Sequence, residues 1–287
     1  MKIRKAVITA AGWGTRFLPI TRSQPKEMLP LVDKPLIHYA VEEAINSGID
    51  QIIIVTAMGK RAIEDYFDRS FELESYLERK GEKELLKHMQ EISSMVDICY
   101  IRQKEQLGLG NAVLMAKDIV GNEPFALILP DDIIDSPVPG LNQMLAVYEK
   151  YGSGVVAVES VSDEDTQKYG IIKPKEVAQG VYQILGMVEK PKPAQAPSRL
   201  GIIGRYLLTP QIFEKIEKTK SDARKEVQLT TALNLLLDDQ KIYACELKGK
   251  RYDAGTPLGW LKANVDLALK RDDIGAEFKE YLKGLLR

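Results

Sequence analysis

Residues 10–30, AAGWGTRFLPITRSQPKEMLP, combine small residues with cations in a way that suits phosphate binding. Ala10, Ala11 and Gly12 let backbone amides come close to a ligand. Arg16 and Lys26 can neutralise phosphate charge. The plainer interpretation is a solvated glycine turn with scattered surface charges. The other residues that could bind ligands or take part in catalysis must decide between this interpretation and phosphate binding.

Three aspartates are candidates for binding a cation. Asp131 and Asp132 end the apolar run in LILPDDII, and Asp253 lies in KRYDAGTP, between a predicted strand and a predicted helix. Mg²⁺ in proteins takes one or two carboxylates together with phosphate oxygens, so this set suits a metal that bridges phosphate groups. The alternatives are a turn for the first pair and a helix cap for Asp253.

Two further polar stretches lie beside predicted strands. In MVEKP, the alternation of a strand sends Glu189 and Lys190 to opposite faces, so that one can meet phosphate and the other hydroxyl groups. In QKEQLGLGNA, Gln103 and Gly108 lie between a strand and a helix. The plainer interpretations are a charged edge strand and a flexible turn.

The loop at residues 10–30 matches neither of two common phosphate-binding motifs. A dinucleotide fingerprint requires a third glycine where Phe17 stands, and the prolines that follow prevent a helix from starting directly. A P-loop requires Lys-Ser or Lys-Thr after its last glycine, and this loop contains no such pair. We therefore expect a long ordered loop after the first strand.

The elements that must position these residues alternate between strand and helix. Apolar runs of strand length include KAVITA, QIIIVTA, VDICYI and FALILP, and segments of helical period such as PLIHYAVEEAINSG separate them. This alternation predicts an α/β fold with a Rossmann-like, mostly parallel mixed sheet flanked by helices. The first strand should lie centrally, with its loop at the carboxyl edge of the sheet, where ligands of such folds bind.

The pattern changes along the chain. Residues 59–95 are highly charged with a helical period, which predicts a pair of surface helices, and the part after residue 161 begins with short strands and turns. We expect a single domain over residues 1–271 and a C-terminal helical tail at 272–287. Within the domain, a first half covers about 1–135 and a β-rich second half about 136–256.

The composition is that of an ordinary globular protein. Of the 287 residues, 45% are apolar and 28% charged, and the formal net charge of −1 predicts neither nucleic acid nor an anionic membrane as a partner. Cys99 and Cys245 lie in apolar runs and are expected to be buried free thiols. The first residues lead into a strand and no apolar run reaches membrane-spanning length, so we expect a cytoplasmic protein.

Taken together, these stretches resemble the bacterial UTP–glucose-1-phosphate uridylyltransferases of the sugar nucleotidyltransferase superfamily. The likeness runs along nearly the whole chain, in family order. The stretches that carry it are AAGWGTRFLPIT, PKEMLPLVDKPLIHYAVEEA, EQLGLGNAV, LPDDII, YGIIKP, VEKP, IIGRYLLTP, VQLTTAL and KRYDAGTPLGWLKANVDLAL.

The resemblance implies that the first half binds UTP and the second half glucose 1-phosphate. The implied nucleotide contacts are the backbone of Ala10, Ala11 and Gly12, the cations Arg16 and Lys26 at the triphosphate, and Gln103 with Gly108 at the uracil. The implied sugar-phosphate contacts are Gly170, Glu189 and Lys190, with Asp132 as a further substrate-binding residue. Asp131 and Asp253 would hold Mg²⁺.

The implied reaction converts UTP and α-D-glucose 1-phosphate to UDP-glucose and pyrophosphate by in-line attack of the sugar phosphate on the α-phosphorus. Its implied catalytic residues are Arg16, Lys26, Lys190 and Asp131. The family further implies a homo-oligomer, either a dimer or a tetramer. The alternatives are a thymidylyltransferase acting on the same sugar phosphate, a catalytically silent regulatory paralogue and, from the α/β pattern and the two glycines only, a nicotinamide oxidoreductase.

The chain departs from the family at one sugar-side loop. The family usually has Gly-Gly-Glu-Ile before QLTDA, whereas ARKEVQLTTA places Arg224 and Lys225 at the glycines and Thr231 at the aspartate. A change of this kind affects the backbone conformations open to the loop, because glycine alone adopts positive φ without strain.

Overall fold

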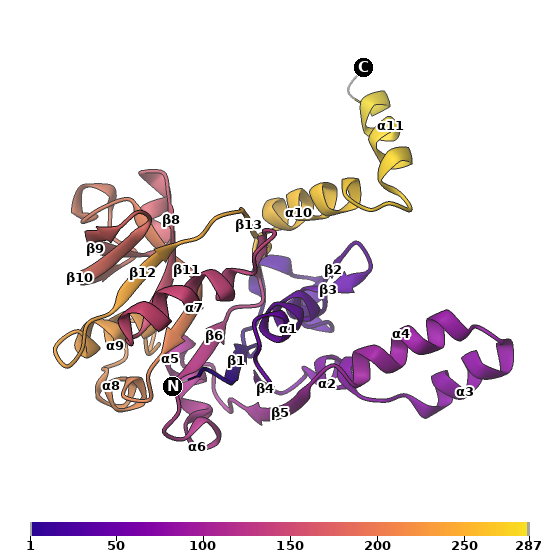
Figure 1. Cartoon of the computed structure of the whole chain (residues 1–287), viewed down its shortest axis with the longest axis horizontal. Helices are drawn as coiled ribbons and strands as arrows, with labels where there is room; N and C mark the ends of the chain where they lie inside the picture. Colours follow the sequence, from indigo (N-terminus) through magenta and orange to yellow (C-terminus); the bar gives the residue numbers. More distant parts are fainter. Residues whose placement is uncertain (1, 286–287) are drawn as a thin grey trace.

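A mixed sheet of nine strands organises the chain in a computed structural model, which describes residues 2–285 (Figure 1). β1 (Lys5–Thr9) lies between two parallel neighbours, as predicted. Across the sheet the order is β5 (Asp97–Arg102), β4 (Gln51–Thr56), β1, β6 (Phe125–Ile128), β11 (Leu200–Leu208), β8 (Val155–Ser160), β12 (Tyr243–Glu246), β10 (Val181–Glu189) and β9 (Gly170–Ala178). The strands from β5 to β6 are parallel, whereas β11 runs antiparallel to both of its neighbours and β9 with β10 forms an antiparallel hairpin.

Helices cover both faces of the sheet, which explains why its strands are apolar on both sides. In β4, Ile52 and Ile54 pack into one hydrophobic cluster, and Ile53 and Val55 pack into another on the opposite face. Helices α1 (Leu36–Asn46) and α7 (Gly140–Tyr151) contribute to the first cluster. The second includes residues of α5 (Gly108–Met115), α6 (Lys117–Val120), α8 (Ile212–Lys218) and α9 (Leu229–Leu236). The predicted α/β class is therefore confirmed.

The chain leaves β1 through an ordered loop, as the prolines predicted. The loop contains the short 3-10 turns η1 (Thr15–Phe17), η2 (Ile20–Arg22) and η3 (Lys26–Met28), and a small ribbon of β2 (Pro30–Leu31) with β3 (Lys34–Pro35). Phe17, Leu29 and Leu31 of this region are buried in a third hydrophobic cluster. The loop is thus held by packing, although it has little regular structure.

A second ribbon joins the end of β6 to a late part of the chain. β7 (Asp132–Asp135) and β13 (Lys250–Asp253) are antiparallel, and α10 (Pro257–Leu269) follows β13 after a short turn. Ile133 and Tyr252 of the ribbon belong to the same cluster as Phe17 and Leu29 of the loop at residues 10–30, which we call the phosphate loop. This ribbon therefore places residues near 131 and residues near 253 beside the loop.

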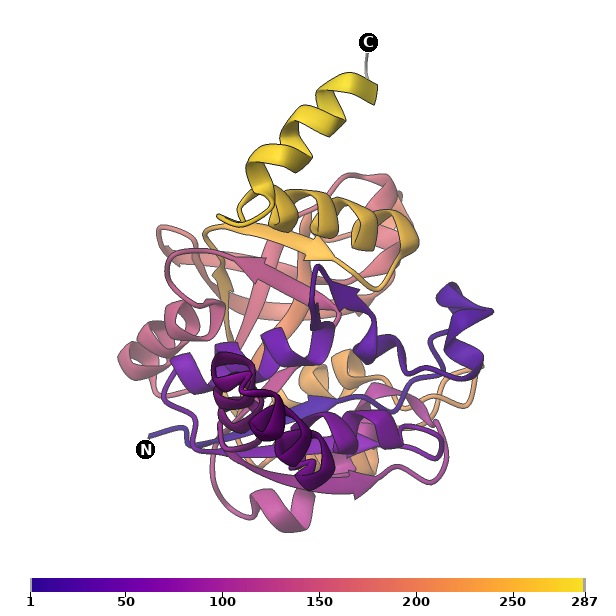
Figure 2. The ribbon, with the colours of Figure 1, turned by 90° about the vertical axis from the view of Figure 1, so that its right-hand side faces the viewer.

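Two groups of helices extend from the body of the molecule. The charged segment at 59–95 forms α2 (Arg61–Phe67), α3 (Phe71–Lys80) and α4 (Lys83–Ser93), and the α3–α4 hairpin extends to the right in Figure 1, which confirms the predicted surface helices. Helix α11 (Gly275–Leu285) points away from the body in both views (Figures 1 and 2). The last two residues of the predicted tail at 272–287 lie outside the described residues.

The two cysteines differ in their surroundings. Cys245 is buried, as expected, and burial raises its thiol pKa to about 11. The expectation for Cys99 was wrong, because β5 is an edge strand of the sheet and its Cys99 is exposed.

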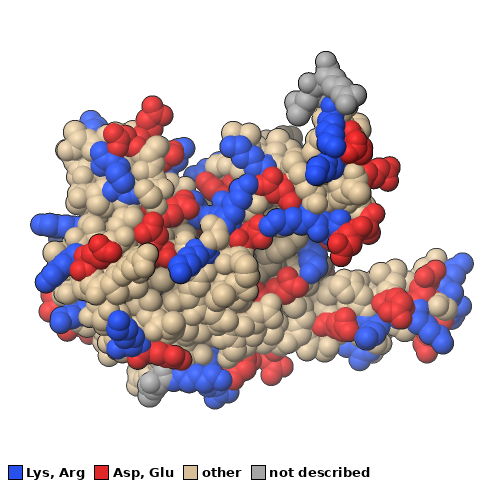
Figure 3. All heavy atoms as spheres, turned by 45° about the horizontal axis from the view of Figure 1, so that its top comes forward, with Lys and Arg blue, Asp and Glu red and all other residues tan. Residues whose placement is uncertain are grey.

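Figure 3 shows Lys and Arg interspersed with Asp and Glu over the viewed face. Among the helices of residues 2–285, none has the length and apolar character needed to cross a membrane.

Candidate active site

The loop after β1 places small residues at the carboxyl edge of the sheet. Ala10 and Ala11 are buried, and the Ala10 N–H donates to the carbonyl of Val55 on β4 at 2.7 Å. Because the Ala10 amide is used within the sheet, it cannot donate to a ligand. Of the three small residues, only Ala11 and Gly12 can offer a backbone N–H to a phosphate. Gly12 is exposed at the start of the loop.

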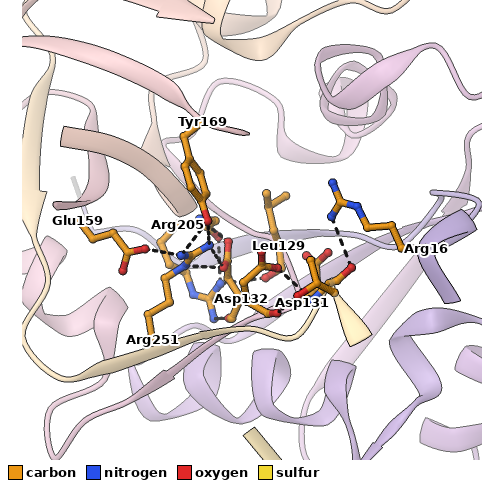
Figure 4. A network of polar contacts seen from close by, with 12 residues as sticks. Arg16, Leu129, Asp131, Asp132, Glu159, Tyr169, Arg205 and Arg251 are labelled. Carbon is orange, nitrogen blue, oxygen red and sulfur yellow. Dashed lines mark hydrogen bonds and ion pairs between the residues drawn. The ribbon is translucent and has the colours of Figure 1, made fainter. Parts of the chain in front are cut away.

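Both predicted loop cations lie near the aspartates. Lys26 on η3 places Nζ 2.5 Å from Oδ2 of Asp131. The exposed Arg16 on η1, labelled in Figure 4, donates to the carbonyl of Gly255 at 3.4 Å. Burial opposes the charge of Lys26, but Asp131 and Glu27 hold its pKa above the ordinary value. Burial likewise opposes the charge of Asp131, but the Lys26 ammonium holds its pKa below the ordinary value. Both side chains are therefore charged at neutral pH.

Asp131 and Asp253 come together through the ribbon of β7 and β13. The ribbon pairs Asp253 with Asp132, and the Ala254 N–H donates to the carbonyl of Asp131 at 2.8 Å. A Cβ atom built on Gly255 would lie 2.6 Å from Oδ2 of Asp131 and 3.1 Å from Oδ1 of Asp253. The two carboxylates therefore face one small space, which stays open because residue 255 is glycine.

This carboxylate pair has the chemistry of a site for a hard divalent cation. Mg²⁺ prefers oxygen ligands and commonly takes one or two carboxylates, with its other positions filled by phosphate oxygens and water. Within residues 2–285, no group of three or more His, Cys, Asp or Glu side chains is arranged to hold a metal. The residues thus fit a cation that protein and phosphate ligands bind jointly.

Asp253 does not act as the cap of the helix that follows it. The side chain of Thr256 caps α10 by accepting the Gly259 N–H at 3.2 Å. Oδ1 of Asp253 instead accepts the Gly255 N–H at 3.1 Å. This bond fixes the carboxylate within the turn before the helix, facing Asp131.

Asp132 lies next to the pair formed by Asp131 and Asp253, and both of its carboxylate oxygens contact other groups of the protein. Oδ1 is 2.6 Å from Nε of Arg251, and Oδ2 accepts the Gly204 N–H at 2.9 Å (Figure 4). Burial raises the pKa of Asp132 to about 6, although Arg251 favours the charged form. The contacts give no support to the prediction that Asp132 binds substrate.

A buried arginine that the sequence interpretation missed supports the turn around Asp131. Arg205, 1% exposed, donates to the carbonyls of Leu129 at 2.9 Å and Asp132 at 2.7 Å, which flank Asp131 in the chain. Its Nη2 is also 2.8 Å from Oε2 of Glu43 on α1. A single charged residue inside the apolar run LGIIGRYLL was the available signal, since a buried charge needs a partner.

The predicted sugar-side residues meet at the ends of β9 and β10. Gly170 pairs with Glu189 in the sheet, and a Cβ on Gly170 would lie 3.3 Å from Oε2 of Glu189 and 2.9 Å from Oγ1 of Thr230. The expectation that Glu189 and Lys190 point to opposite faces was wrong. Lys190 leaves the strand with φ +46, and its Nζ lies 3.0 Å from Oε1 of Glu189.

Gln103 and Gly108 lie together after β5, as predicted. The Gln103 side chain is 4% exposed, and its Nε2 donates to Oδ1 of Asn111 at 2.8 Å and to the carbonyl of Gly108 at 3.3 Å. Because these contacts engage the amide nitrogen, the side-chain carbonyl is the group that can accept a hydrogen bond from a base.

The glycines at the start of α5 are explained by packing rather than by flexibility. Gly110 donates to the carbonyl of Val227 at 2.9 Å, and a Cβ on Gly110 would lie 2.7 Å from that oxygen. A Cβ on Gly108 would lie 3.0 Å from the Val227 nitrogen. The chain near residue 227 therefore covers the turn that holds Gln103.

The sugar-side loop that differs from the family pattern, at residues 222–226, forms a closed turn without the family's glycines. Oδ1 of Asp222 accepts the Arg224 and Glu226 N–H groups at 2.8 and 3.0 Å, and the Asp222 carbonyl accepts that of Lys225 at 2.9 Å. Lys225 adopts φ +62, a conformation that glycine would tolerate better. Thr231 is exposed, whereas the adjacent Thr230 lies against Gly170.

The fold and the site together define a nucleotidyltransferase, with a phosphate loop and a carboxylate pair at the carboxyl edge of a mostly parallel region of the sheet. The chain belongs to the nucleotidyl transferase family, whose model matches residues 5–270. Enzymes of this family generally use divalent metal ions. The pair formed by Asp131 and Asp253 is the donor set described above that fits one.

Similar proteins narrow this class. The UTP–glucose-1-phosphate uridylyltransferase YngB of Bacillus subtilis is 50% identical over 286 residues, which cover 100% of this chain and 96% of that protein. A UDP-glucose pyrophosphorylase solved in complex with UDP-glucose has a TM-score of 0.87 at 46% identity, covering 94% of this chain and 100% of that chain. The UTP-bound UGPase from Acinetobacter baumannii has a TM-score of 0.91 at 40% identity, covering 98% of this chain and 99% of that chain.

Proposed function

We propose that the chain is a UTP–glucose-1-phosphate uridylyltransferase, which converts UTP and α-D-glucose 1-phosphate to UDP-glucose and pyrophosphate. The observation that carries this proposal is the meeting of Asp131 and Asp253 with Lys26 of the phosphate loop. An array of this kind neutralises phosphate charge from several directions, as transfer between two phosphate compounds requires. The similar proteins described above supply the identity of the nucleotide and the sugar.

The proposed reaction is an in-line displacement at the α-phosphorus of UTP. A phosphate oxygen of glucose 1-phosphate forms the new bond to this phosphorus, and the bond to the pyrophosphate oxygen breaks on the opposite side. The attacking phosphate is already ionised at neutral pH, so the step needs no general base. Catalysis then depends on position and on charge neutralisation.

We assign the charged residues by their places around this step. Arg16 and Lys26 of the phosphate loop stabilise the leaving pyrophosphate, and Lys190 offsets the charge of the attacking phosphate. Asp131 and Asp253 would hold Mg²⁺, which when bound supplies positive charge to the phosphate oxygens of both substrates. Gly170 and Glu189 would contact the sugar, while the amides of Ala11 and Gly12 face the nucleotide phosphates.

Pyrophosphate release tests the function directly. The purified chain should be assayed with UTP, dTTP, CTP and ATP, each combined with glucose, galactose and mannose 1-phosphates. We expect UTP with glucose 1-phosphate to be the fastest pair. Equal or faster use of dTTP would favour the thymidylyltransferase, and UTP binding without turnover would favour the silent paralogue.

Replacing Lys190 by alanine should weaken the use of glucose 1-phosphate far more than the binding of UTP. The ammonium group lies on the acceptor side of the site, where it pairs with Glu189 at 3.0 Å. Calorimetric titration with each ligand separates the two effects. Lys192→Ala, which removes an exposed lysine two positions along the chain, is the matched control. Equal weakening of both ligands would argue against the acceptor-side role.

Replacing Gln103 by alanine should lower the preference for UTP over CTP. The side-chain carbonyl of Gln103 can accept the N3–H of uracil, whereas N3 of cytosine is an acceptor. An unpaired buried polar group costs roughly 1–3 kcal/mol, so the wild type should prefer UTP by about tenfold to a hundredfold. Steady-state kcat/KM for both nucleotides measures this ratio. An unchanged ratio in the variant would show that Gln103 does not read the base.

We also propose that the enzyme is a homo-oligomer, a dimer or a tetramer, that works in the cytoplasm. Helices α10 and α11 carry large exposed apolar side chains, including Leu258, Leu261 and Tyr281, and α11 points away from the body of the molecule (Figure 1). Sedimentation velocity with Leu261→Asp tests the first proposal. The free thiols of both cysteines are in keeping with a reducing compartment.

A further inference from the structure

An arginine on β13 with a largely covered side chain connects the surroundings of the carboxylate pair to the sugar side. The side chain of Arg251 is 9% exposed and lies two positions before Asp253. In Figure 4 its guanidinium group lies between Asp132 on one side and Glu159 with Tyr169 on the other. One side chain thus contacts residues that adjoin the carboxylate pair and residues on the sugar side.

The first side of this contact supports the aspartates. Nε and Nη2 of Arg251 lie 2.6 and 2.5 Å from Oδ1 of Asp132, the residue that follows Asp131. Asp132 also pairs with Asp253 across the ribbon of β7 and β13. The ion pair therefore fixes the two strands whose ends carry Asp131 and Asp253.

The second side of the contact supports the sugar-phosphate residues. Nη1 and Nη2 of Arg251 lie 3.3 and 3.4 Å from the Tyr169 hydroxyl, and Cζ lies 5.2 Å from the centre of its ring. Nη1 also forms an ion pair with Glu159 at the end of β8. Tyr169 directly precedes Gly170, and its carbonyl accepts the Lys190 N–H at 3.0 Å. Tyr169 is thus joined by the backbone to Gly170 and Lys190, two of the three residues assigned to the sugar side.

We propose that Arg251 is a positioning residue that sets the sugar-phosphate site relative to the Asp131–Asp253 pair. It acts through Asp132 and Tyr169, and the inference rests on the uridylyltransferase function proposed above. In-line attack requires the reacting atoms at about 3–3.5 Å, and a misplacement of about 1 Å can cost a hundredfold in rate. A planar guanidinium can bond in two directions at once, which a lysine ammonium on a flexible stem does not reproduce.

Two variants test this role with different degrees of disturbance. Arg251→Lys keeps the positive charge beside Asp132 but loses the planar fork, and Tyr169→Phe removes only the hydroxyl on the sugar side. For Arg251→Lys we expect kcat to fall by about a hundredfold, while the calorimetric Kd for UTP changes by less than about twofold. For Tyr169→Phe we expect a rise of several-fold in KM for glucose 1-phosphate and an unchanged Kd for UTP.

The matched control is Arg199→Lys, because Arg199 is a partly exposed sugar-side arginine that pairs with Asp163. This variant should behave as the wild type does. If Arg251→Lys kept its kcat, or if UTP binding and glucose 1-phosphate use fell together in both variants, Arg251 would be a stabilising residue only and the inference would be overturned. A wild-type chain that released no pyrophosphate from its substrates would instead overturn the proposed function, and this inference with it.

Discussion

Asp253→Asn should lower kcat roughly a thousandfold or more, because it removes a charge that would hold the cation shared by both substrates. Asparagine keeps the shape of the side chain, and its carbonyl can still accept the Gly255 N–H that Oδ1 of Asp253 accepts at 3.1 Å. The fold should therefore survive. The measurement is steady-state turnover with saturating Mg²⁺, alongside a thermal unfolding curve that checks the fold.

Thr256→Ala provides the control for this experiment. Thr256 caps α10, so its loss should lower the free energy of unfolding by about 1 kcal/mol and leave turnover nearly unchanged. The two variants, three positions apart, thus separate the cap from the carboxylate pair. Near-normal turnover of Asp253→Asn would mean that the pair formed with Asp131 does not hold a catalytic cation.

Arg205→Met should lower the free energy of unfolding by about 3–5 kcal/mol, because it leaves the Glu43 carboxylate, whose side chain is only 9% exposed, without its ion-pair partner. The carbonyls of Leu129 and Asp132, which accept from Arg205 at 2.9 and 2.7 Å, would also lose their donor. Urea denaturation, followed by circular dichroism, measures the change. Turnover should fall as well, since those carbonyls flank Asp131.

A double-mutant cycle identifies the cause of this loss. Adding Glu43→Gln to Arg205→Met should recover part of the stability, because the buried charge is then gone. Arg199→Met removes a partly exposed arginine and should cost about 1 kcal/mol or less. A similar small cost for Arg205→Met would contradict the role assigned to its buried ion pair.

The main lines of the fold and the phosphate side of the site could be predicted because they depend on local patterns. Apolar runs of strand length place Ala10 and Asp131 at strand ends, and parallel strands bring those ends to one edge. The prolines after Gly12 exclude a helix by fixing φ and removing donors. These features follow from residues close together in sequence.

The contacts of Arg251 and Arg205 could not be predicted in the same way. Arg251 meets Asp132, Glu159 and Tyr169 only because β13 pairs with β7. That pairing joins segments far apart in the sequence, and no periodic pattern of residues in either segment predicts it. The expectation that successive side chains of a strand point to opposite faces also failed at Lys190. Lys190 itself has a positive φ at the end of the strand, which changes the direction of its side chain.

The glycines at the start of α5 show a similar limit. A pair of glycines after a strand favours a turn, whereas Gly108 and Gly110 both lie in the first turn of α5. The reason for Gly110, however, is the backbone of Val227, which would lie 2.7 Å from any added Cβ. Such a steric requirement comes from a segment more than a hundred positions away in the sequence.

The ribbon of β7 and β13 also bears on when the site forms as the chain folds. Pairing Asp132–Asp135 with Lys250–Asp253 closes a long loop. The chain loses conformational entropy when it closes such a loop, and this loss comes before the contacts that stabilise the pairing have formed. The β1–β4 pairing spans a much shorter segment and should form earlier. During refolding from urea, the phosphate loop should therefore acquire protection from hydrogen exchange before Asp253 reaches Asp131, and catalytic competence should be among the last properties that the molecule regains.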